Sequence, residues 1–504
     1  MNSKSLIESV ELAKIVRKLI PKKKSILSEK GKNQESVLFR EIAESNSIRS
    51  DDEIIEAHGF SRRRYQQILS EINGWLFNRL VDLELPAEKF SDYARRLFAL
   101  DRGHANLRIL ARLGGAFSAN EEAKALFEEA KALEEWHLAI SLLSPLLTWT
   151  SLSGDKEAYG QWISEQPRLL ALESALADAN EVSERAIMVF AKSSAEHPEL
   201  LKIIQPAIER LTPVARKLGT FRLNEALLLL RKKAQQVTMD YDEALAICEE
   251  MDALLVQYPL FANRSRKSRN ATSKLMCHVQ QRKYEDAGRV AESALDLFNE
   301  GDQNWHSFQE WRFVLFMHTK QFSNGYEIVR QVMSRPSFSA QTQATRDVWN
   351  LFLRYAEYFM DMPVSGVTFH KNEKAGELHR RIMEKFPSFK GDFAGREMAA
   401  IVLEILIVLK HRQSDLFSRT ESLQKYKVRH LQPGIETQSS IFIDLVQLLE
   451  LYDSDRSKMA EVAAPMVKRM LAIKTIDPVQ SQQVMPYEML WAEMLEQWET
   501  AEPL

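Results

Sequence analysis

Histidine and carboxylate side chains, the residue types that hold metal ions, gather in the stretch HKNEKAGELH. This stretch contains His370, Glu373, Glu377 and His379. Paired ligands on a metal-binding helix stand four residues apart, because that spacing puts both side chains on one face. His370 and His379 are nine residues apart, which is off that face. We therefore predict no metal site in this stretch.

Other motifs that serve enzymatic chemistry are missing from the sequence. It has no glycine-rich phosphate loop, no HExxH, no GxSxG and no dinucleotide-binding fingerprint. We predict no catalytic residues, no cofactor and no enzymatic activity. An unrecognised enzyme whose groups converge from distant helices, or an accessory subunit of an enzyme, stays open as the third alternative.

Three consecutive arginines, Arg62, Arg63 and Arg64, follow the segment EIIEAHGFS. A short helix, a turn at Gly59 and arginines that open a second helix resemble a helix-turn-helix. The resemblance places Ile54, Phe60 and Ile68 at core positions. Side chains and backbone amides at such a helix start both favour phosphate, so the resemblance implies contact with nucleic acid.

Departures from that pattern favour a second interpretation of the arginines. Ile55 stands where the family has a small residue, and His58 stands where it has an aliphatic one. The apolar face of the second helix continues to Leu80, which indicates burial along its length. Residues 1–80 carry 15 basic and 11 acidic residues, a mild excess for a DNA-binding module. We favour packed helices with a solvated arginine rim, and keep nucleic-acid contact as the alternative.

A second basic stretch, NRSRKSRN, begins at residue 263 and contains Arg264, Arg266, Lys267 and Arg269. Clustered arginines suit the capture of a carboxylate or phosphate, because the guanidinium fork donates two hydrogen bonds at once. These four residues are candidates for binding a protein partner. The alternative is a solvated loop that leads into the next helix.

Aromatic residues concentrate in NWHSFQEWRFVLF and DVWNLFLRYAEYF. Trp305, Trp311 and Trp349 belong to rows at helical spacing in these two segments. Aromatic side chains offer much contact area for little lost rotamer freedom, so they are candidates for binding a partner peptide or helix. A row at this spacing is also typical of a helix core.

The composition indicates a folded protein with no strong overall field. The chain has 504 residues, with 45% hydrophobic and 27% charged residues and a net charge of −3. This length exceeds one compact core, so several domains or an extended array are expected. Two cysteines are too few for a disulfide framework. The start of the chain has no signal-peptide pattern and no apolar run is long enough for a membrane span, so we predict a cytoplasmic protein without a membrane partner.

Apolar residues recur at helical spacing along nearly the whole chain, and alternating β-type runs are missing. Prolines fall between the apolar runs, where they end helices, because proline lacks an amide donor. We therefore predict an all-α fold.

Three segments share a repeated pattern, in which an aromatic residue is followed three positions later by a small residue and three further by an aliphatic one. The triplets are Tyr241, Ala244 and Ile247; Tyr284, Ala287 and Val290; and Phe322, Gly325 and Ile328. The pattern resembles the second helix of the tetratricopeptide repeat, over residues 221 to 337. The intervals of 43 and 38 residues depart from the family's period, and Lys232, Leu275 and Phe313 replace its first-helix glycine.

The resemblance implies a right-handed α-solenoid of helical hairpins. We predict a small helical module over residues 1–85, hairpins of unassigned register over 86–220 and the tetratricopeptide-like array over 221–504. Such arrays expose long surfaces to peptides or helices. An adaptor or scaffold that binds another protein or peptide is the leading expectation. The alternative is a regulator with a nucleic-acid-binding N-terminal module and a tetratricopeptide-like sensor, and the oligomeric state stays open.

Overall fold

The fold is all-α, as predicted. A computed structural model describes residues 38, 51–81, 85–88, 90–113, 116–190, 197–238, 240–339, 341–364, 396–410, 416–431, 436–452, 455–473 and 483–500. Within these residues every regular element is a helix and there is no strand. None of the described helices is both long and apolar enough to cross a bilayer. The chain divides into two compact units, Met1–Leu170 and Ala171–Leu504, and the predicted boundaries at 85 and 220 stay predictions.

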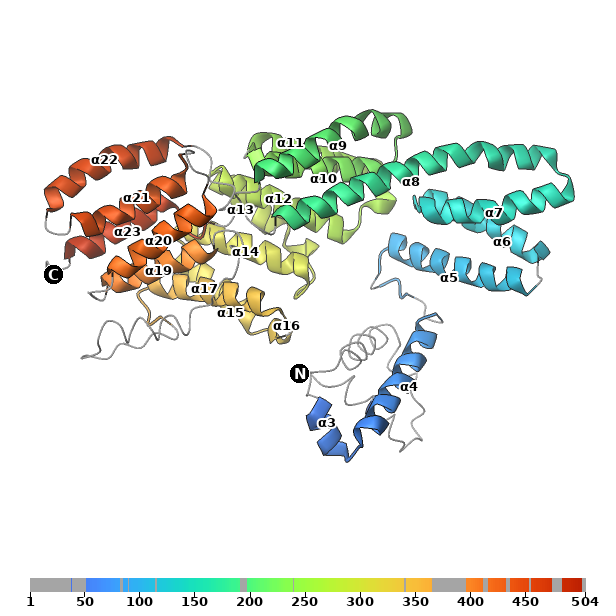
Figure 1. Cartoon of the computed structure of the whole chain (residues 1–504), viewed down its shortest axis with the longest axis horizontal. Coiled ribbons are helices and arrows are strands. Elements are labelled where there is room, and N and C mark those ends of the chain that lie inside the picture. The colour runs from blue at the N-terminus through green and yellow to red at the C-terminus, as the bar shows by residue number, and fades with distance from the viewer. Residues whose placement is uncertain are drawn as a thin grey trace. The chain divides into compact units, whose positions relative to one another are not determined.

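The first unit consists of helices (Figure 1). They are α3 (Asp51–His58), α4 (Arg62–Val81), α5 (Asp92–Arg112), α6 (Ala116–Ala132), α7 (Trp136–Ser153) and the first part of α8 (Lys156–Phe190). Helix α6 packs against both α5 and α7. Arg96 on α5 donates two hydrogen bonds, of 2.8 and 2.9 Å, to Glu129 on α6. This bidentate pair fixes the register of the two helices.

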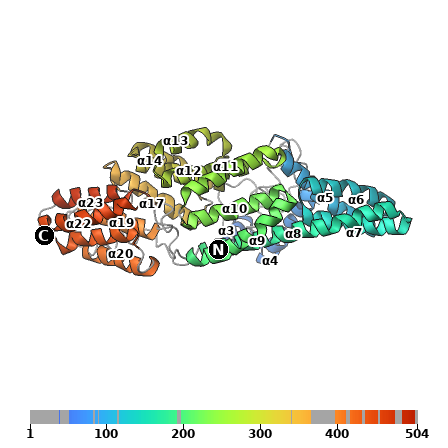
Figure 2. The ribbon, with the colours of Figure 1, turned by 90° about the horizontal axis from the view of Figure 1, so that it is seen from above.

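The second unit begins in the second part of α8 and continues as paired helices. They are α9 (His197–Leu218), α10 (Phe221–Thr238), α11 (Tyr241–Gln257), η2 (Pro259–Phe261), α12 (Arg264–Gln280), α13 (Tyr284–Ser293), η3 (Leu295–Leu297), α14 (Gln303–His318), α15 (Phe322–Met333), α16 (Pro336–Ser339) and α17 (Gln343–Phe359). Helix α10 packs on α11, α12 on α13 and α14 on α15. Helices α12, α13 and α14 lie together in the view of Figure 2.

The remaining described helices continue this pairing. They are α19 (Arg396–Lys410), α20 (Leu416–His430), α21 (Gln438–Leu451), α22 (Arg456–Ala472) and α23 (Tyr487–Thr500). Helix α19 packs on α20, and α21 on α22. One continuous hydrophobic core joins α12 to α23, and a smaller one joins α8, α9 and α10. Neighbouring pairs from α12 to α23 therefore share one core.

Polar side chains fix where many of these helices begin. Asp240, Asn263, Asp302 and Thr342 stand immediately before α11, α12, α14 and α17. Each side chain accepts a hydrogen bond from the backbone amide three residues on, which satisfies a donor that has no partner within the helix.

Four helix ends share one backbone geometry. A non-glycine residue with positive φ follows or ends the helix in each case: Glu134 (55°), Arg282 (61°), Lys320 (59°) and Asp361 (55°). The next amide donates to the carbonyl five residues earlier, at 2.8 or 2.9 Å in all four. This left-handed cap satisfies terminal carbonyls and reverses the chain. In α6–α7, α12–α13 and α14–α15 it makes a three-residue hairpin turn.

The aromatic and small-residue pattern of the sequence lies in the first turn of each helix concerned. Tyr241, Tyr284 and Phe322 are the first residues of α11, α13 and α15, and the small residues three positions later are buried. Helix α7 repeats the pattern with Trp136, Ala139 and Leu142, all of them buried. Because it also follows the left-handed turn at Glu134, α6–α7 is a hairpin of the same kind. Sequence reasoning assigned no register to this part of the chain.

Candidate binding groove

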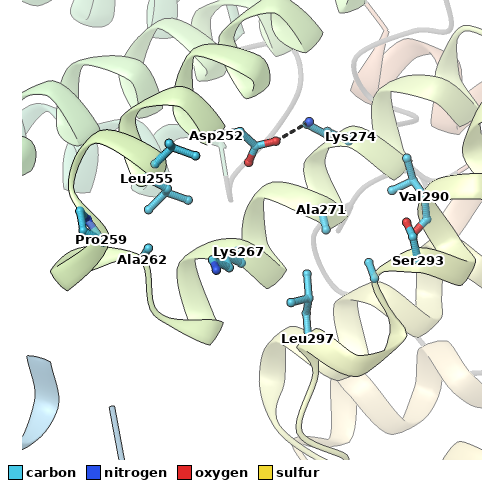
Figure 3. A pocket seen from close by; sticks show the side chains of 12 residues that line it. Asp252, Leu255, Pro259, Ala262, Lys267, Ala271, Lys274, Val290, Ser293 and Leu297 are labelled. Atoms are coloured by element: carbon cyan, nitrogen blue, oxygen red, sulfur yellow. Dashed lines mark hydrogen bonds and ion pairs between the residues drawn. The ribbon is translucent and has the colours of Figure 1, made fainter. Parts of the chain in front are cut away.

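A groove of about 600 Å³ lies on the second unit between α11, α12 and α13 (Figure 3). Its lining is mostly apolar and includes Leu255, Ala271, Val290 and Leu297. Polar side chains on α11 and α12 lie along one part of it. Grooves with apolar walls and a few placed polar groups are the usual form of a binding site.

The chain between α11 and α12 is fixed by contacts with α10. Phe261 stacks on Phe221, with 4.4 Å between the ring centroids. The Tyr258 hydroxyl donates to the Gly219 carbonyl at 3.0 Å. Asn263 then caps α12 and sets its first turn. These contacts fix the part of the groove lining that Pro259 and Ala262 form.

An ion-pair network crosses the groove wall. Lys274 Nζ on α12 lies 2.6 Å from Glu249 and 2.5 Å from Asp252, both on α11. Asn270 donates to Asp252 at 2.7 Å and to the Cys248 carbonyl at 2.8 Å. Burial opposes the charge of Lys274, but its hydrogen bonds to Asp252 and Glu249 raise its pKa above the ordinary value. The network therefore holds α11 and α12 at a fixed separation (Figure 3).

Val256 and Lys267 are among the lining residues that are exposed to solvent. Val256 is 81% exposed at the end of α11, and Lys267 is exposed on α12. Leu295, next to the groove in η3, is an exposed large apolar residue as well. An apolar surface beside a lysine suits a partner segment that carries apolar side chains and a carboxylate.

The predicted basic stretch forms the first turns of α12, so it is helical and not a loop. Arg266 Nε lies 2.7 Å from Glu225 on α10, and its guanidinium lies 5.0 Å from the centre of the Phe221 ring. Arg269 is 3.6 Å from the same carboxylate. Arg264 donates to the Asp296 carbonyl and, at 3.0 Å, to Asn299. Of the four predicted residues, Lys267 is the one that lines the groove.

The three predicted tryptophans lie in the interior. Trp305 and Trp311 on α14 and Trp349 on α17 are buried and belong to the large core. Trp349 packs edge-on against Phe352 at 5.5 Å. Their predicted role in contacting a partner gains no support from these positions, and they take no part in the groove.

The N-terminal arginines lie where the helix-turn-helix resemblance places them. Gly59 has a φ of +63° between α3 and α4, and α4 begins at Arg62. The core positions Ile54, Phe60 and Ile68 are buried. The Tyr65 hydroxyl on α4 donates to buried Asp51 on α3 at 2.8 Å. The interpretation as packed helices with a solvated arginine rim is also consistent with the structure, because Arg62 is exposed and pairs with Asp52 at 3.1 Å.

The described part of the chain was searched for side chains that could hold a metal ion together. No group of three or more His, Cys, Asp or Glu side chains gathers there in an arrangement able to hold a metal ion. The stretch that contains His370 and His379 lies outside the described residues.

Sequence reasoning missed a cluster of buried charges. Arg354 and Glu357 on α17, Glu404 on α19 and Arg419 on α20 are all buried. Arg419 Nη1 lies 2.8 Å from Glu404 Oε2. Burial raises the pKa of Glu404, and nearby Arg354 acts against that rise. The signal in the sequence is Glu404, a charged residue within the apolar run AAIVLEILIVL.

The fold and groove define a class, an all-α protein of stacked helical hairpins with an open, apolar groove. Comparison of the chain with models of known protein families, with curated proteins and with solved structures found no match. The functional conclusion therefore depends on the geometry of the chain itself.

Proposed function

We propose that this protein is a non-enzymatic adaptor that binds another protein or a peptide, and that its hairpins form a right-handed, tetratricopeptide-like solenoid. The observation that carries the proposal is the groove between α11, α12 and α13, with apolar walls, exposed Val256 and exposed Lys267. The shared hairpin turns support the repeat architecture. We keep the predicted cytoplasmic location as part of this proposal.

The chemistry of the groove suggests its ligand. Apolar side chains of the partner would cover Val256 and Leu297, and a carboxylate would pair with Lys267. Lys274 is already held by two carboxylates, so Lys267 is the cation that a ligand would meet first. We therefore propose a partner segment with apolar residues and at least one Asp or Glu.

Affinity purification from the native host, with and without nuclease, tests this function. The tagged wild-type chain is expected to retain a stoichiometric protein that survives nuclease. A Val256→Asp chain is expected to lose that protein, because the new carboxylate puts a charge on the apolar wall and opposes an acidic partner. Retention by the Val256→Asp chain at the wild-type level would exclude this groove as the site.

Val428→Asp provides a matched control. Val428 on α20 and Val256 on α11 are both 81% exposed near a helix end. The two substitutions introduce the same charge at equal exposure, so their effects on stability should agree. The control chain is expected to retain the partner.

The N-terminal geometry favours a second candidate function, a regulator whose first module binds nucleic acid. The turn at Gly59 and the arginines at the start of α4 support it. We then expect salt-dependent binding of duplex DNA that is lost in the triple variant Arg62→Glu, Arg63→Glu, Arg64→Glu. Fluorescence anisotropy with labelled DNA at several salt concentrations measures this.

The control is the triple variant Arg108→Glu, Arg112→Glu, Arg168→Glu. It makes the same change in charge at other exposed sites of the first unit. Equal losses of binding in both triple variants would show an unspecific effect of charge. The absence of wild-type binding at low salt would exclude the regulator.

A further inference from the structure

The C-terminal helix α23 packs in an unusual way for a helix that follows a series of hairpins. Its main packing is against α19 and α21 (Figure 1). Its first turn and the residues just before it also reach much earlier parts of the second unit. Arg282, between α12 and α13, donates to Glu488 at 3.2 Å through Nη2 and more closely through Nη1. His318 Nε2 on α14 lies 2.8 Å from the Gln483 carbonyl oxygen.

Along α23 from its start to its end, the residues that it contacts come from progressively later helices of the second unit. At its middle, the Tyr358 hydroxyl on α17 donates to Glu493 at 3.1 Å. Near its end, Arg456 at the start of α22 donates to the Glu499 carbonyl at 2.8 Å. The helix has 14 residues and is thus about 21 Å long. One short helix therefore makes contacts with residues from the α12–α13 turn to the start of α22.

The buried residues of α23 form a single row. Tyr487, Leu490, Trp491, Met494 and Trp498 are all buried, with the spacing i, i+3, i+4, i+7 and i+11. Tyr487 stacks on Phe442 of α21, with 4.5 Å between centroids. Proteins that bind an amphipathic helix in an apolar groove recognise it through apolar residues at such a spacing. In this chain the ligand is part of the same molecule.

Charge complements the apolar row. The helix, YEMLWAEMLEQWET, carries four glutamates and no basic residue. At one end Arg282 pairs with the Glu488 carboxylate. At the other end the Arg456 guanidinium donates to the Glu499 backbone carbonyl and lies 5.3 Å from the centre of the Trp498 ring. The face is thus suited to acidic helices and disfavours basic ones.

We propose that the face formed by α17, α19 and α21 is a second docking surface, which binds an acidic amphipathic helix of a partner protein in exchange for α23. The partner helix has large apolar residues at the five positions of the α23 row and a glutamate or aspartate opposite Arg282. Helix α23 occupies the surface as an internal ligand until the partner displaces it. This surface is separate from the groove between α11 and α13, and the inference stands whether or not that groove binds a partner.

A labelled peptide of residues 483–500 and the full-length chain test this exchange by fluorescence anisotropy. An internal ligand competes at high effective concentration, so the wild-type chain is expected to bind the peptide weakly. The Trp491→Ala chain, with a weakened internal helix, is expected to bind it with a dissociation constant about tenfold lower. Circular dichroism and thermal unfolding establish that the variant is folded. A folded Trp491→Ala chain that does not bind the peptide would overturn the proposal.

A charge reversal tests the register of the peptide. In the Trp491→Ala background, Arg282→Glu is expected to weaken binding of the natural peptide and to strengthen binding of a Glu488→Arg peptide. Arg289→Glu is the matched control, because Arg289 is exposed on α13 and pairs with Asp286. Equal effects of the Arg282 and Arg289 substitutions would contradict docking in the α23 register.

Hydrogen exchange of the wild-type chain gives a test that does not depend on a variant. The amides of α23 are expected to exchange faster than those of α19 and α21, because α23 opens without global unfolding. Exchange of all three helices at one rate would make α23 a permanent part of the core and overturn the proposal. The chain could instead form a concentration-dependent dimer that Trp491→Ala abolishes. That result would assign the surface to a second copy of this chain and overturn the proposal that it binds a helix of another protein.

Discussion

Arg419 and Glu404 form an ion pair inside the second unit, with Nη1 of the arginine 2.8 Å from Oε2 of the glutamate. Their side chains are only 5% and 4% exposed. The pair joins α20 to α19 within the continuous core. Burial lowers the pKa of Arg419 to about 10, so the arginine stays charged at neutral pH, with the Glu404 carboxyl group in contact with it.

Removing one member of this pair should be costly. We expect Arg419→Met to lower the free energy of unfolding by about 3 kcal/mol, because it leaves the buried Glu404 carboxyl group without the guanidinium that contacts it. The double variant Arg419→Met, Glu404→Gln should recover part of the loss, since it removes the charge as well. Urea denaturation measures both.

An exposed pair on the same two helices is the control. Arg429 on α20 lies 3.0 Å from Glu397 on α19, and Arg429 is largely exposed. Arg429→Met should cost less than about 1 kcal/mol. Equal losses for Arg419→Met and Arg429→Met would contradict the importance of burial.

His318 makes stability depend on pH. Burial lowers its pKa to about 4, against an ordinary value of about 6.5. Well above pH 6.5 both the folded and the unfolded histidine are almost entirely neutral. As the pH falls from 6.5 to 4, the unfolded chain takes up a proton that the folded chain does not. The free energy of unfolding should therefore fall over this window, by at most about 3 kcal/mol.

The comparison with His318→Gln isolates this contribution from the titration of other groups. The difference in unfolding free energy between the wild-type and variant chains should be nearly constant above pH 7. Below pH 6.5 the wild-type chain should lose stability relative to the variant. Denaturant unfolding at several pH values gives the difference. A difference independent of pH would show that the folded chain protonates His318 as readily as the unfolded one.

The two cysteines should be unreactive in the folded chain. Cys248 and Cys277 are free and buried. Burial raises the pKa of both thiols, that of Cys277 to about 12. The thiolate is the reactive form, so a colourimetric thiol reagent at pH 8 should modify neither cysteine until guanidinium unfolds the chain, when two thiols react. Rapid modification of the folded chain would indicate that the α11–α12 region opens.

The sequence predicted those parts of the fold that depend on local patterns. Helical periodicity indicated the all-α class, and the positions of Tyr241, Tyr284 and Phe322 correctly indicated where second helices of hairpins begin. These features follow from contacts within one hairpin. The left-handed residues that make the turns, such as Arg282 and Lys320, carry no glycine signal, so their geometry was not predicted.

The candidate sites were harder to predict, because they depend on contacts between distant segments. The groove is formed by residues that are ordinary helix positions in sequence, such as Leu255 and Val290. A tryptophan at helical spacing faces either the core or a partner, and only packing decides; Trp349 is fully buried. The pairing of Arg282 with Glu488 spans 206 residues, and no local pattern announces it.

The shared hairpin pattern of α7 makes a last prediction about stability. Ala139 is fully buried three residues after Trp136, at the position held by Ala244, Ala287 and Gly325 in the later hairpins. If this position brings two helices close together, a larger side chain has no room there. We expect Ala139→Leu to lower the free energy of unfolding by about 1–3 kcal/mol. Ala132→Leu, at an exposed position on α6, should change it by less than about 0.5 kcal/mol. Thermal and urea unfolding of the two variants measure the difference, and a neutral Ala139→Leu would mean that α7 shares the sequence pattern of the other hairpins without their close packing.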